Sequence, residues 1–561
     1  MSRKILVLVL SLFIVHSISG QERSISGRII LDSKHGGEII IQLYRLKTSG
    51  SRVYPLSKAD IYGAAKPLMV KRIPDEGEFY FDGLDSGYYS IVAFQDSDQN
   101  GKVSFDPPEP FGWFFSGEGY RFSPIDLTKS DRKDLKIYLR VPTHFDKRDR
   151  IIDHGALRWI KGLPVLQLWG GPSERGFAHG YLVARQIIDF FEYYILEDSW
   201  QSSERYQNIF VPFLENQFNY PREFLEECKA VIRGMKASGV DMKVEFLNRD
   251  FCLTDLLAIN CYIERRAAFL GTPASSCTQF AFWGDLTSGG ELKGGLVAAR
   301  NMDGECDVRK VTVSHFLLFA VDPSLSGKKR WISAMWPGFV GTISGINEDG
   351  IYSMENAGGT GPGPVPDGIV PCSFIQKFVL ENSDKRATPE TVLGMMKKYI
   401  CSTGGITAAG SIILWAMPYT GQENPAFVFE GSRTGYAVRL PDDVRPKDRF
   451  NIMASNHHRV LGYDPDHPDY SLGRRISFSS RWRYEVGKQT LEAWSRENKI
   501  LDIEDAKRLL QSVAHGTTEY SVIFSANQMR ILVAVDDLKP DLWDAPYMKW
   551  VELGFDELFA R

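Results

Sequence analysis

The sequence has little cysteine, no strong excess of either charge and only one long apolar run. Seven Cys occur in 561 residues, too few for a disulfide scaffold, and the odd number leaves at least one thiol without a partner in the chain. The net charge of −4 gives no basic field that predicts binding to nucleic acid or acidic lipid. No P-loop or dinucleotide fingerprint occurs either, so nothing indicates nucleotide-driven chemistry.

The overall composition is that of a globular protein. Hydrophobic residues make up 43% and charged residues 24% of the chain, which excludes a disordered chain, a collagen-like repeat and a coiled coil. A chain of 561 residues is too long for one small domain and predicts two or three.

The one long apolar run lies at the N-terminus. Arg3 and Lys4 precede residues 5–15, which are apolar except for Ser11, and residues 17–20, which are small except for Ile18, follow, as in a cleavable secretory signal peptide. The run is shorter than the about 20 residues that span a bilayer. We therefore expect residues 1–20 to be removed and the protein to be exported, periplasmic or secreted, with no membrane span; an N-terminal anchor is the alternative. Six of the Cys could then form disulfides, but the sequence does not show which Cys would pair with which.

Residues 21–145 are expected to form a small all-β sandwich domain. Short runs rich in β-branched and aromatic residues alternate with Gly, Asp and Ser, and no helical period occurs, a pattern typical of a sandwich. Residues 77–96 resemble the transthyretin-like or carboxypeptidase-regulatory-like accessory modules of secreted enzymes. Gly83 and Gly87 are expected to turn the chain between two strands of this module.

A loop of this domain carries oxygen side chains at alternate positions. Asp96, Asp98 and Asn100 are followed by Gly101 and then by Asp106. This spacing suits a hard cation such as Ca²⁺, and it predicts a structural calcium. The bidentate Glu expected at the twelfth position is missing, because Pro107 stands there. A plain Asx-rich turn fits the same residues, so both interpretations stay open.

Residues 146–561 are expected to form a second, α+β domain. The charged segment 144–150 is predicted to be the linker before it. Amphipathic patterns predict helices, and alternating or apolar runs predict strands between them. Such an order is typical of a layered α+β fold. The predicted helices cover residues 174–198, 221–238, 373–382 and 389–400; the predicted strands cover 278–283, 296–300, 412–417, 426–429 and 531–535.

Cys277 begins the most informative of these strands. If the chain folds back at Gly289 and Gly290, Cys277 lies opposite Met302 and Asp303 and close to Arg300, because antiparallel neighbours are about 5 Å apart. On the hairpin alone, a buried inert Cys beside a surface ion pair is favoured over a reactive thiol, because a free Cys is commonly buried and inert.

The order of motifs favours the reactive thiol. The chain resembles the N-terminal-nucleophile (Ntn) hydrolases of the acyl-CoA:6-aminopenicillanic-acid acyltransferase type, peptidase family C45, and more distantly the choloylglycine and other linear-amide hydrolases. Six motifs carry the resemblance over most of the chain, at residues 171–180, 277–284, 300–303, 345–357, 454–457 and 480–484.

The resemblance implies a fold and a chemistry. The fold would be a four-layer αββα domain, cut by the protein itself between Ser276 and Cys277. Cys277 would be the nucleophile with its own α-amine as base, so neither a catalytic His nor a cofactor is needed. Asn356 and Asn456 would donate to the oxyanion, Asp303 would hold the α-amine, and Arg300 would lower the thiol pKa and fix Asp303. Arg483 matches the late family Arg better than Arg481.

These residues predict an enzyme that hydrolyses or transfers the acyl group of a small linear amide. A papain-like Cys/His hydrolase without self-cleavage and a binding protein without catalysis are the alternatives. Trp283, Trp336 and Phe339 could line an acyl pocket or simply belong to the core. His457, His458 and His467 lack the spacing of a Zn²⁺ site. The substrate and the oligomeric state do not follow from the sequence.

Overall fold

The protein is described by a computed structural model, which covers residues 22–31, 35–54, 56, 60, 65–104, 108–114, 124–141, 144–200, 202–268, 277–304, 311–323, 327–441, 449–514, 516–537 and 544–561. The chain forms two compact units, one mainly of the described residues before Pro142 and one of those from Pro142 to Arg561. No helix in these ranges has both the length and the apolar character needed to cross a bilayer.

The first unit is built from strands. One sheet has the order β10-β1-β6, a second has the order β5-β2-β7-β8 with β9 also paired to β7, and β3 and β4 form a two-stranded sheet. Alternate residues such as Phe79 and Phe81 on β6 enter a common core with Ile39 and Ile41 of β2, as the period of a strand requires. The strands are β1 (Arg23–Leu31), β2 (Glu38–Arg45), β3 (Lys47–Ser49), β4 (Arg52–Tyr54), β5 (Met69–Ile73), β6 (Gly77–Leu84), β7 (Tyr88–Asp96), β8 (Phe111–Trp113), β9 (Ile125–Asp126) and β10 (Arg132–Leu139).

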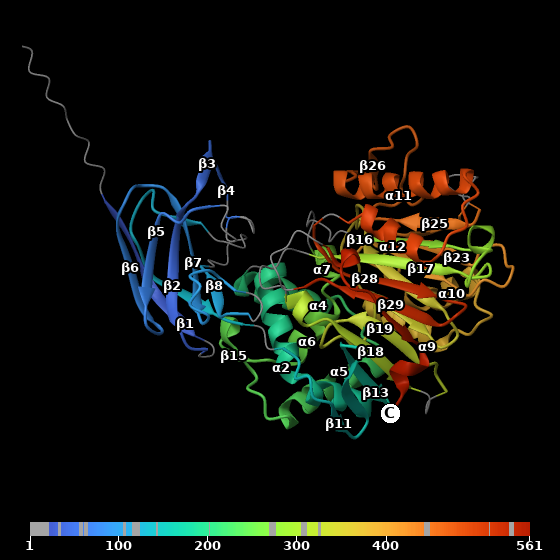
Figure 1. The fold of residues 1–561 in the computed structure, drawn as a ribbon, viewed down its shortest axis with the longest axis horizontal. Coiled ribbons are helices and arrows are strands. Elements are labelled where there is room, and N and C mark those ends of the chain that lie inside the picture. Colours follow the sequence, from blue (N-terminus) through green and yellow to red (C-terminus); the bar gives the residue numbers. More distant parts are fainter. Residues whose placement is uncertain are drawn as a thin grey trace, which may run out of the picture. The chain divides into compact units, whose positions relative to one another are not determined.

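The second unit mixes helices with two large sheets (Figure 1). Its ten-stranded sheet consists, in spatial order, of β11 (Arg150–Ile152), β12 (Gly155–Ile160), β13 (Leu163–Trp169), β18 (Leu317–Asp322), β19 (Trp331–Met335), β20 (Ser344–Asn347), β21 (Tyr352–Ala357), β22 (Ser411–Ala416), β23 (Ala426–Gly431) and β24 (Tyr436–Arg439). Its six-stranded sheet consists of β25 (Asn451–Ala454), β16 (Cys277–Phe282), β17 (Val297–Asp303), β28 (Thr518–Ser525), β29 (Arg530–Val535) and β30 (Val551–Gly554).

Helices lie against both sheets. Helices α11 and α12 contact strands of the six-stranded sheet, and α1 and α9 contact strands of the ten-stranded sheet. The principal helices are α1 (Pro172–Leu182), α2 (Ala184–Phe190), α4 (Val211–Asn216), α5 (Arg222–Ala237), α6 (Leu253–Asn260), α9 (Cys372–Asn382), α10 (Pro389–Met396), α11 (Phe478–Arg496) and α12 (Ile503–Ser512). Short elements complete the unit: α3 (Ser203–Arg205), α7 (Arg265–Ala268), α8 (Val311–Ser314), β14 (Lys243–Val244), β15 (Arg249–Asp250), β26 (Tyr470–Ser471) and β27 (Arg474–Arg475).

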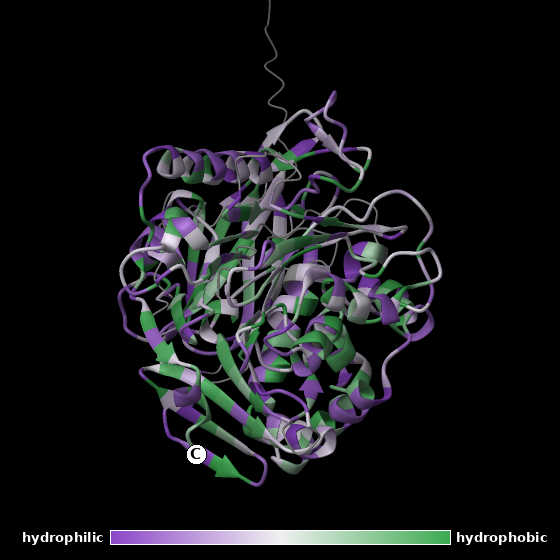
Figure 2. Ribbon diagram, turned by 90° about the vertical axis from the view of Figure 1, so that its right-hand side faces the viewer, coloured by the Kyte–Doolittle hydropathy of each residue, from purple (hydrophilic) through white to green (hydrophobic). Residues whose placement is uncertain are grey.

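Strand β16 is buried on both faces, and its two faces differ. Phe280 and Phe282 pack in a cluster with residues of α11 and α12, whereas Cys277 and Ala281 join the main core on the opposite side. On that side β16 contacts β21 and β22 of the ten-stranded sheet. Figure 2 shows hydrophobic residues concentrated on the inner strands of the unit and hydrophilic residues on the outer helices and loops. The period of the strand thus places Cys277 between the two sheets.

The predicted elements largely match, with two differences. The helix predicted over 174–198 is divided at Val183, whose φ of −132° and ψ of 30° leave the helical region, and it ends in a wide π-helical segment, Phe191–Trp200. Phe145, in the predicted linker, is buried in the core of the second unit, and β11 begins at Arg150.

The six cysteines that the structure describes are all free thiols, five of them buried. Disulfides among these six, which the expected export would have allowed, are therefore absent. The predicted signal peptide at residues 1–20 lies outside the described residues, so export stays a prediction.

Candidate active site

Strands β16 and β17 form the predicted hairpin. Cys277 pairs with Met302 and Gln279 pairs with Arg300, so Arg300 is the diagonal neighbour of Cys277 on the same face. Diagonal neighbours lie within reach of long side chains. The turn expected at Gly289 and Gly290 therefore gives the register that brings the thiol and the guanidinium together.

The backbone of Cys277 is held at both its polar atoms. Its N–H donates to Asn456 Oδ1 at 2.8 Å. Its carbonyl oxygen accepts from Asn356 Nδ2 at 3.3 Å and from Arg483 Nη1. These side chains come from three elements far apart in the chain: the segment after β25, strand β21 and helix α11. These hydrogen bonds fix the backbone of Cys277, the first residue of β16, on both its nitrogen and its carbonyl side.

The thiol lies in a buried, positively charged environment. Cys277 is 1% exposed, and Arg300 Nη2 donates to its Sγ at 3.5 Å. Burial raises the pKa of the Cys277 thiol, the charge of Arg300 lowers it, and the Asp303 carboxylate raises it. The charge of Arg300 therefore lowers the thiol pKa as expected, but burial outweighs it, and the pKa of the Cys277 thiol lies above its ordinary value.

Arg300 is itself fully buried and multiply bonded. Its Nη1 donates to the Ile343 carbonyl at 2.8 Å and to the Ser344 hydroxyl, and its Nη2 donates to the Glu355 carbonyl. These acceptors lie next to or within β20 and β21 of the facing sheet. The guanidinium therefore links the two sheets, because its planar fork can serve several acceptors at once.

Asp303 contacts Arg483, although Arg300 was expected to fix it. Asp303 Oδ1 accepts from Thr518 Oγ1 at 2.5 Å, and its Oδ2 lies 4.0 Å from Arg483 Nη1. The register between β17 and β28 shifts between Met302 and Asp303, and such an irregularity re-aims a side chain. Arg483 was predicted over Arg481, and the structure places Arg481 on the surface beside Asp469.

The two predicted oxyanion donors are oriented differently. Asn356 directs its Nδ2 at the carbonyls of Cys277, Ala454 and Ser455. Asn456 uses its Oδ1 as an acceptor for Cys277 N–H and for Arg483 Nη2, and its Nδ2 donates to Ala357 O at 2.8 Å. In this orientation Asn456 binds the backbone N–H of Cys277, the nitrogen that the family resemblance assigned to Asp303.

Three neighbours of the site were missed by sequence reasoning. Thr278 Oγ1 accepts from Arg483 Nη1 at 2.7 Å, Thr518 binds Asp303, and Ser480 Oγ accepts from the Asn456 N–H at 2.8 Å. Thr278 and Ser480 lie within or at the edge of the quoted motifs, which was the one available signal. Nothing in the sequence marks Thr518.

The histidines considered for a metal are dispersed. His457 Nδ1 lies 2.8 Å from Ser480 Oγ, and burial keeps its pKa well below the usual value. His458 is bonded through Nε2 to the Gly431 carbonyl, whereas His467 pairs with Asp464 on the surface. The three share no site.

The predicted calcium loop lies in the first unit. Asp96 and Asp98 come together with Glu109, which was not predicted. Asn100 Nδ2 donates to Asp98 Oδ2 at 2.7 Å. Asp106 and the predicted cleavage residue Ser276 lie outside the described residues.

Comparisons with known proteins give weak likenesses. No protein-family model matches the sequence, and no curated protein matches it. Similar solved structures include a Caenorhabditis elegans N-acylethanolamine-hydrolyzing acid amidase ortholog, with 14% identity, 45% of this chain and 93% of that one covered, and a TM-score of 0.31. A mutant conjugated bile acid hydrolase from Clostridium perfringens has 11% identity, 50% and 97% coverage and a TM-score of 0.31.

A penicillin V acylase from Agrobacterium tumefaciens has 10% identity, 50% and 88% coverage and a TM-score of 0.28. At scores this low, function has to be inferred from the residues of the site.

Proposed function

We propose that the protein is an exported, self-processing cysteine amidohydrolase or acyltransferase that acts on a linear carbon–nitrogen amide bond. The observation that carries this proposal is the arrangement around Cys277: a buried thiol at the first position of a strand, next to Arg300, with its own N–H and carbonyl bonded by Asn456, Asn356 and Arg483. An inert structural Cys needs no such set of buried polar groups around its backbone. We further propose that the two sheets and their helices form a four-layer αββα domain, with the first unit as a β-sandwich accessory domain.

The first step would be self-cleavage. Cys277 Sγ attacks the carbonyl carbon of Ser276, the thiol proton is transferred to the departing nitrogen, and the C–N bond breaks to give a thioester. Water then hydrolyses the thioester, which frees the Ser276 carboxylate and regenerates the thiol. The new α-amine of Cys277 stays within reach of Asn456 Oδ1, which already accepts the N–H of this nitrogen at 2.8 Å.

The α-amine would then serve as the base for catalysis. Its ordinary pKa of about 7.7–8.0 lies close to the about 8.5 of a thiol, so it accepts the thiol proton near neutral pH. Burial raises the thiol pKa in the uncut chain, and the positive charge of Arg300 is the feature that favours the thiolate. The attack on substrate gives an acyl-thioester and releases the amine; water or a second amine resolves the thioester.

The developing oxyanion needs donors that are already in place. Asn356 Nδ2 and the Arg483 guanidinium both point at the backbone of Cys277, and loss of one such donor typically costs about 10²–10³ in rate. Asp303 holds Arg483 at 4.0 Å, so its proposed role is to position the donor and, through it, Asn456.

The acyl side of the substrate would be apolar. Trp336 and Phe339 belong to a cluster of buried aromatic rings that reaches Tyr520, 5.9 Å from Trp336 between ring centroids. Tyr520 hydroxyl lies 3.2 Å from Ser344 Oγ, a partner of Arg300. Trp283, by contrast, lies just beyond the far end of β16 from Cys277.

The Cys/His alternative has no support in the described residues. Within them, the thiol of Cys277 has Arg300 and Met302 as side-chain partners and no imidazole. His457, which follows Asn456 in the chain, has its Nδ1 beside Ser480 and Ser455.

Trapping the acyl-enzyme tests the proposal. Purified protein is mixed with a panel of N-acyl amides, quenched in acid and analysed by intact and peptide mass spectrometry. We expect an acyl adduct on Cys277 and none in Cys277→Ala. A panel member that is hydrolysed without any adduct on Cys277, or equally well by Cys277→Ala, would show that another residue is the nucleophile.

A further inference from the structure

We propose that Asp96, Asp98 and Glu109 bind one Ca²⁺ ion in the first unit. Each of the three offers a carboxylate oxygen, and these oxygens all lie within 4.8 Å of one another. Two ligands of the same Ca²⁺ are separated by at most about 5 Å, because each Ca–O distance is about 2.3–2.6 Å. The three oxygens therefore fit one coordination sphere without movement of the backbone.

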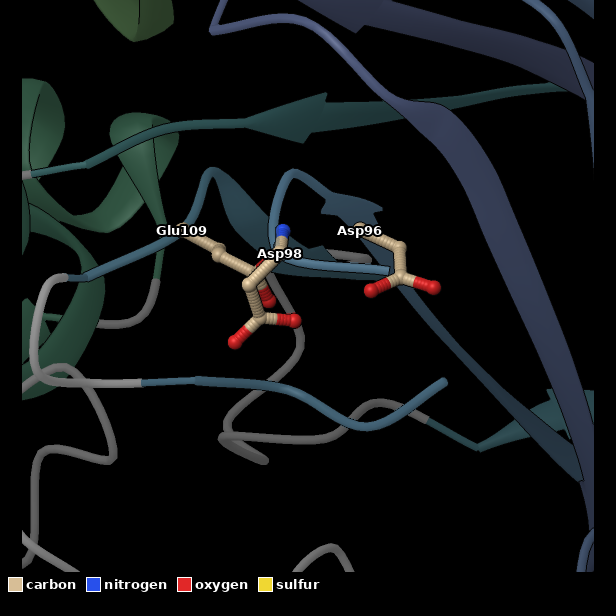
Figure 3. Close-up of side chains that lie close together, drawn as sticks. All are labelled: Asp96, Asp98 and Glu109. Atoms are coloured by element: carbon tan, nitrogen blue, oxygen red, sulfur yellow. Dashed lines mark hydrogen bonds between the residues drawn. The ribbon is translucent and has the colours of Figure 1, made fainter. Parts of the chain in front are cut away.

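Asp96 provides an independent indication of a ligand. It is 2% exposed, and its Oδ1 is buried without a hydrogen-bond partner, while its Oδ2 accepts from the Gly101 N–H at 3.1 Å. Figure 3 shows the Asp96 carboxylate at the end of β7 with one oxygen directed toward Asp98 and Glu109. A buried carboxylate oxygen without a donor is costly, and a bound cation would satisfy it.

The charges of these three carboxylates lack a cationic partner among the residues that the structure describes. Within the described residues, no Lys or Arg forms an ion pair with Asp96, Asp98 or Glu109. Arg72, which lines the neighbouring cavity, pairs with Glu38. Three carboxylates close together repel one another, and Glu109 is only 5% exposed. A divalent cation relieves this repulsion more fully than any neutral donor does.

Glu109 replaces the ligand that the spacing of the sequence lacked. Its Oε1 accepts from the Ser97 N–H at 2.5 Å and its Oε2 from the Ser104 N–H at 2.9 Å. These bonds bring Glu109 back over the loop, although it lies two positions beyond Pro107. Asn100, predicted as a ligand, instead bonds Asp98 and so shapes the loop.

The ion has a route to the site. A cavity of about 470 Å³ is lined by Asp96 together with Gly37, Glu38, Arg72, Gln99, Asn100 and Gly101. It leaves room for the water molecules that complete the six to eight oxygen ligands of Ca²⁺. Mg²⁺ requires a smaller octahedral shell and dehydrates reluctantly, so we expect it to bind at least about tenfold more weakly.

Calorimetric titration of the full chain, stripped with a chelator, tests the site. We expect one saturable Ca²⁺ site with a dissociation constant of about 1 mM or below. Asp98→Asn removes an exposed carboxylate with little risk to folding, and it should weaken binding about tenfold or more, as should Glu109→Gln. Glu78→Gln, an exposed change on β6 of the same unit, should leave binding unchanged.

Circular dichroism of each variant without Ca²⁺ checks the fold, and Asp98→Asn decides the question if Glu109→Gln does not fold. Absence of saturable binding up to about 10 mM Ca²⁺, or binding that Asp98→Asn leaves as strong as in the parent chain, would overturn the proposal.

Discussion

The two faces of the β16–β17 hairpin have the same backbone and opposite characters. One face carries Phe280, Phe282, Val297 and Ala299 into the cluster beneath α11 and α12. The other carries Cys277, Gln279, Arg300 and Met302 toward the ten-stranded sheet. Because side chains alternate along a strand, one hairpin can be anchored by apolar packing while its other face presents buried polar groups. Substitutions on the apolar face should therefore change mainly the stability of the fold, and substitutions on the polar face should change mainly the activity.

The largest effect is expected on the polar face, at Cys277. Cys277→Ala should give one uncut chain with amidase activity reduced about 10⁴-fold or more, because loss of a nucleophile removes the covalent route. Cys228→Ala, a buried thiol on α5, is the matched control and should cut and turn over normally. Self-cleavage and activity are measured on denaturing gels and with an N-acyl amide. A Cys277→Ala chain that is still active would remove the thiol from the mechanism.

Arg300→Lys should cost about 10²–10³ in kcat/KM. Lys keeps a charge but cannot serve the Ile343 and Glu355 carbonyls and the thiol together. Arg300→Gln should in addition move the alkaline limb of the pH–rate profile to higher pH, since the charge of Arg300 lowers the thiol pKa. An unmoved profile would mean that Arg300 serves only to join the two sheets.

Asp303→Asn should lower kcat about 10- to 10²-fold, because a neutral amide holds Arg483 less firmly and hydrogen bonds between charged groups are the stronger ones. Asp285→Asn, an exposed change just after β16, is the control and should behave as the parent chain. Activity per folded molecule and the extent of cleavage are measured together. Equal losses in both variants would point to a general effect on the hairpin.

Phe282→Ala tests the apolar face. Removing this buried ring should lower the free energy of unfolding by about 3–5 kcal/mol, while activity per folded molecule changes less than about fivefold at low temperature. Denaturant titration and a cleavage assay at the same temperature separate the two effects. If the folded variant remains uncut, the apolar face also controls the chemistry, and the proposed separation between the two faces is wrong.

The smallest effect is expected from removing the first unit. A chain that begins at residue 142 should still cleave itself, since each of the described residues bonded to Cys277 belongs to the second unit. The truncation starts before Phe145 because that side chain packs in the core of the second unit. A folded truncation that stays uncut would assign the first unit a part in the active site.

The sequence predicted the parts of the fold that local pattern controls. The Cys277 hairpin and its register, the strand character of the first unit and helix α5 follow from periodicity and turn residues. The resemblance to a family singled out Asn356, Asn456 and Arg483, which the structure brings to Cys277.

What the sequence could not supply depends on contacts between distant segments. Thr518 reaches Asp303 through the pairing of β17 with β28, and Glu109 lies beside Asp96 and Asp98 through its bonds to the Ser97 and Ser104 N–H groups. The orientation of the Asn456 amide follows from the whole network of Cys277, Arg483 and Ala357. No local spacing encodes such arrangements.

The central claim is that Cys277 becomes an N-terminus, and N-terminal sequencing of the purified protein tests it most directly. The account predicts two N-termini in equal amounts. One belongs to a chain that begins Cys277-Thr278-Gln279, and the other belongs to the chain that ends at Ser276. A fully active amidase whose only N-terminus lies near Gln21, with the chain intact beyond residue 277, would contradict it.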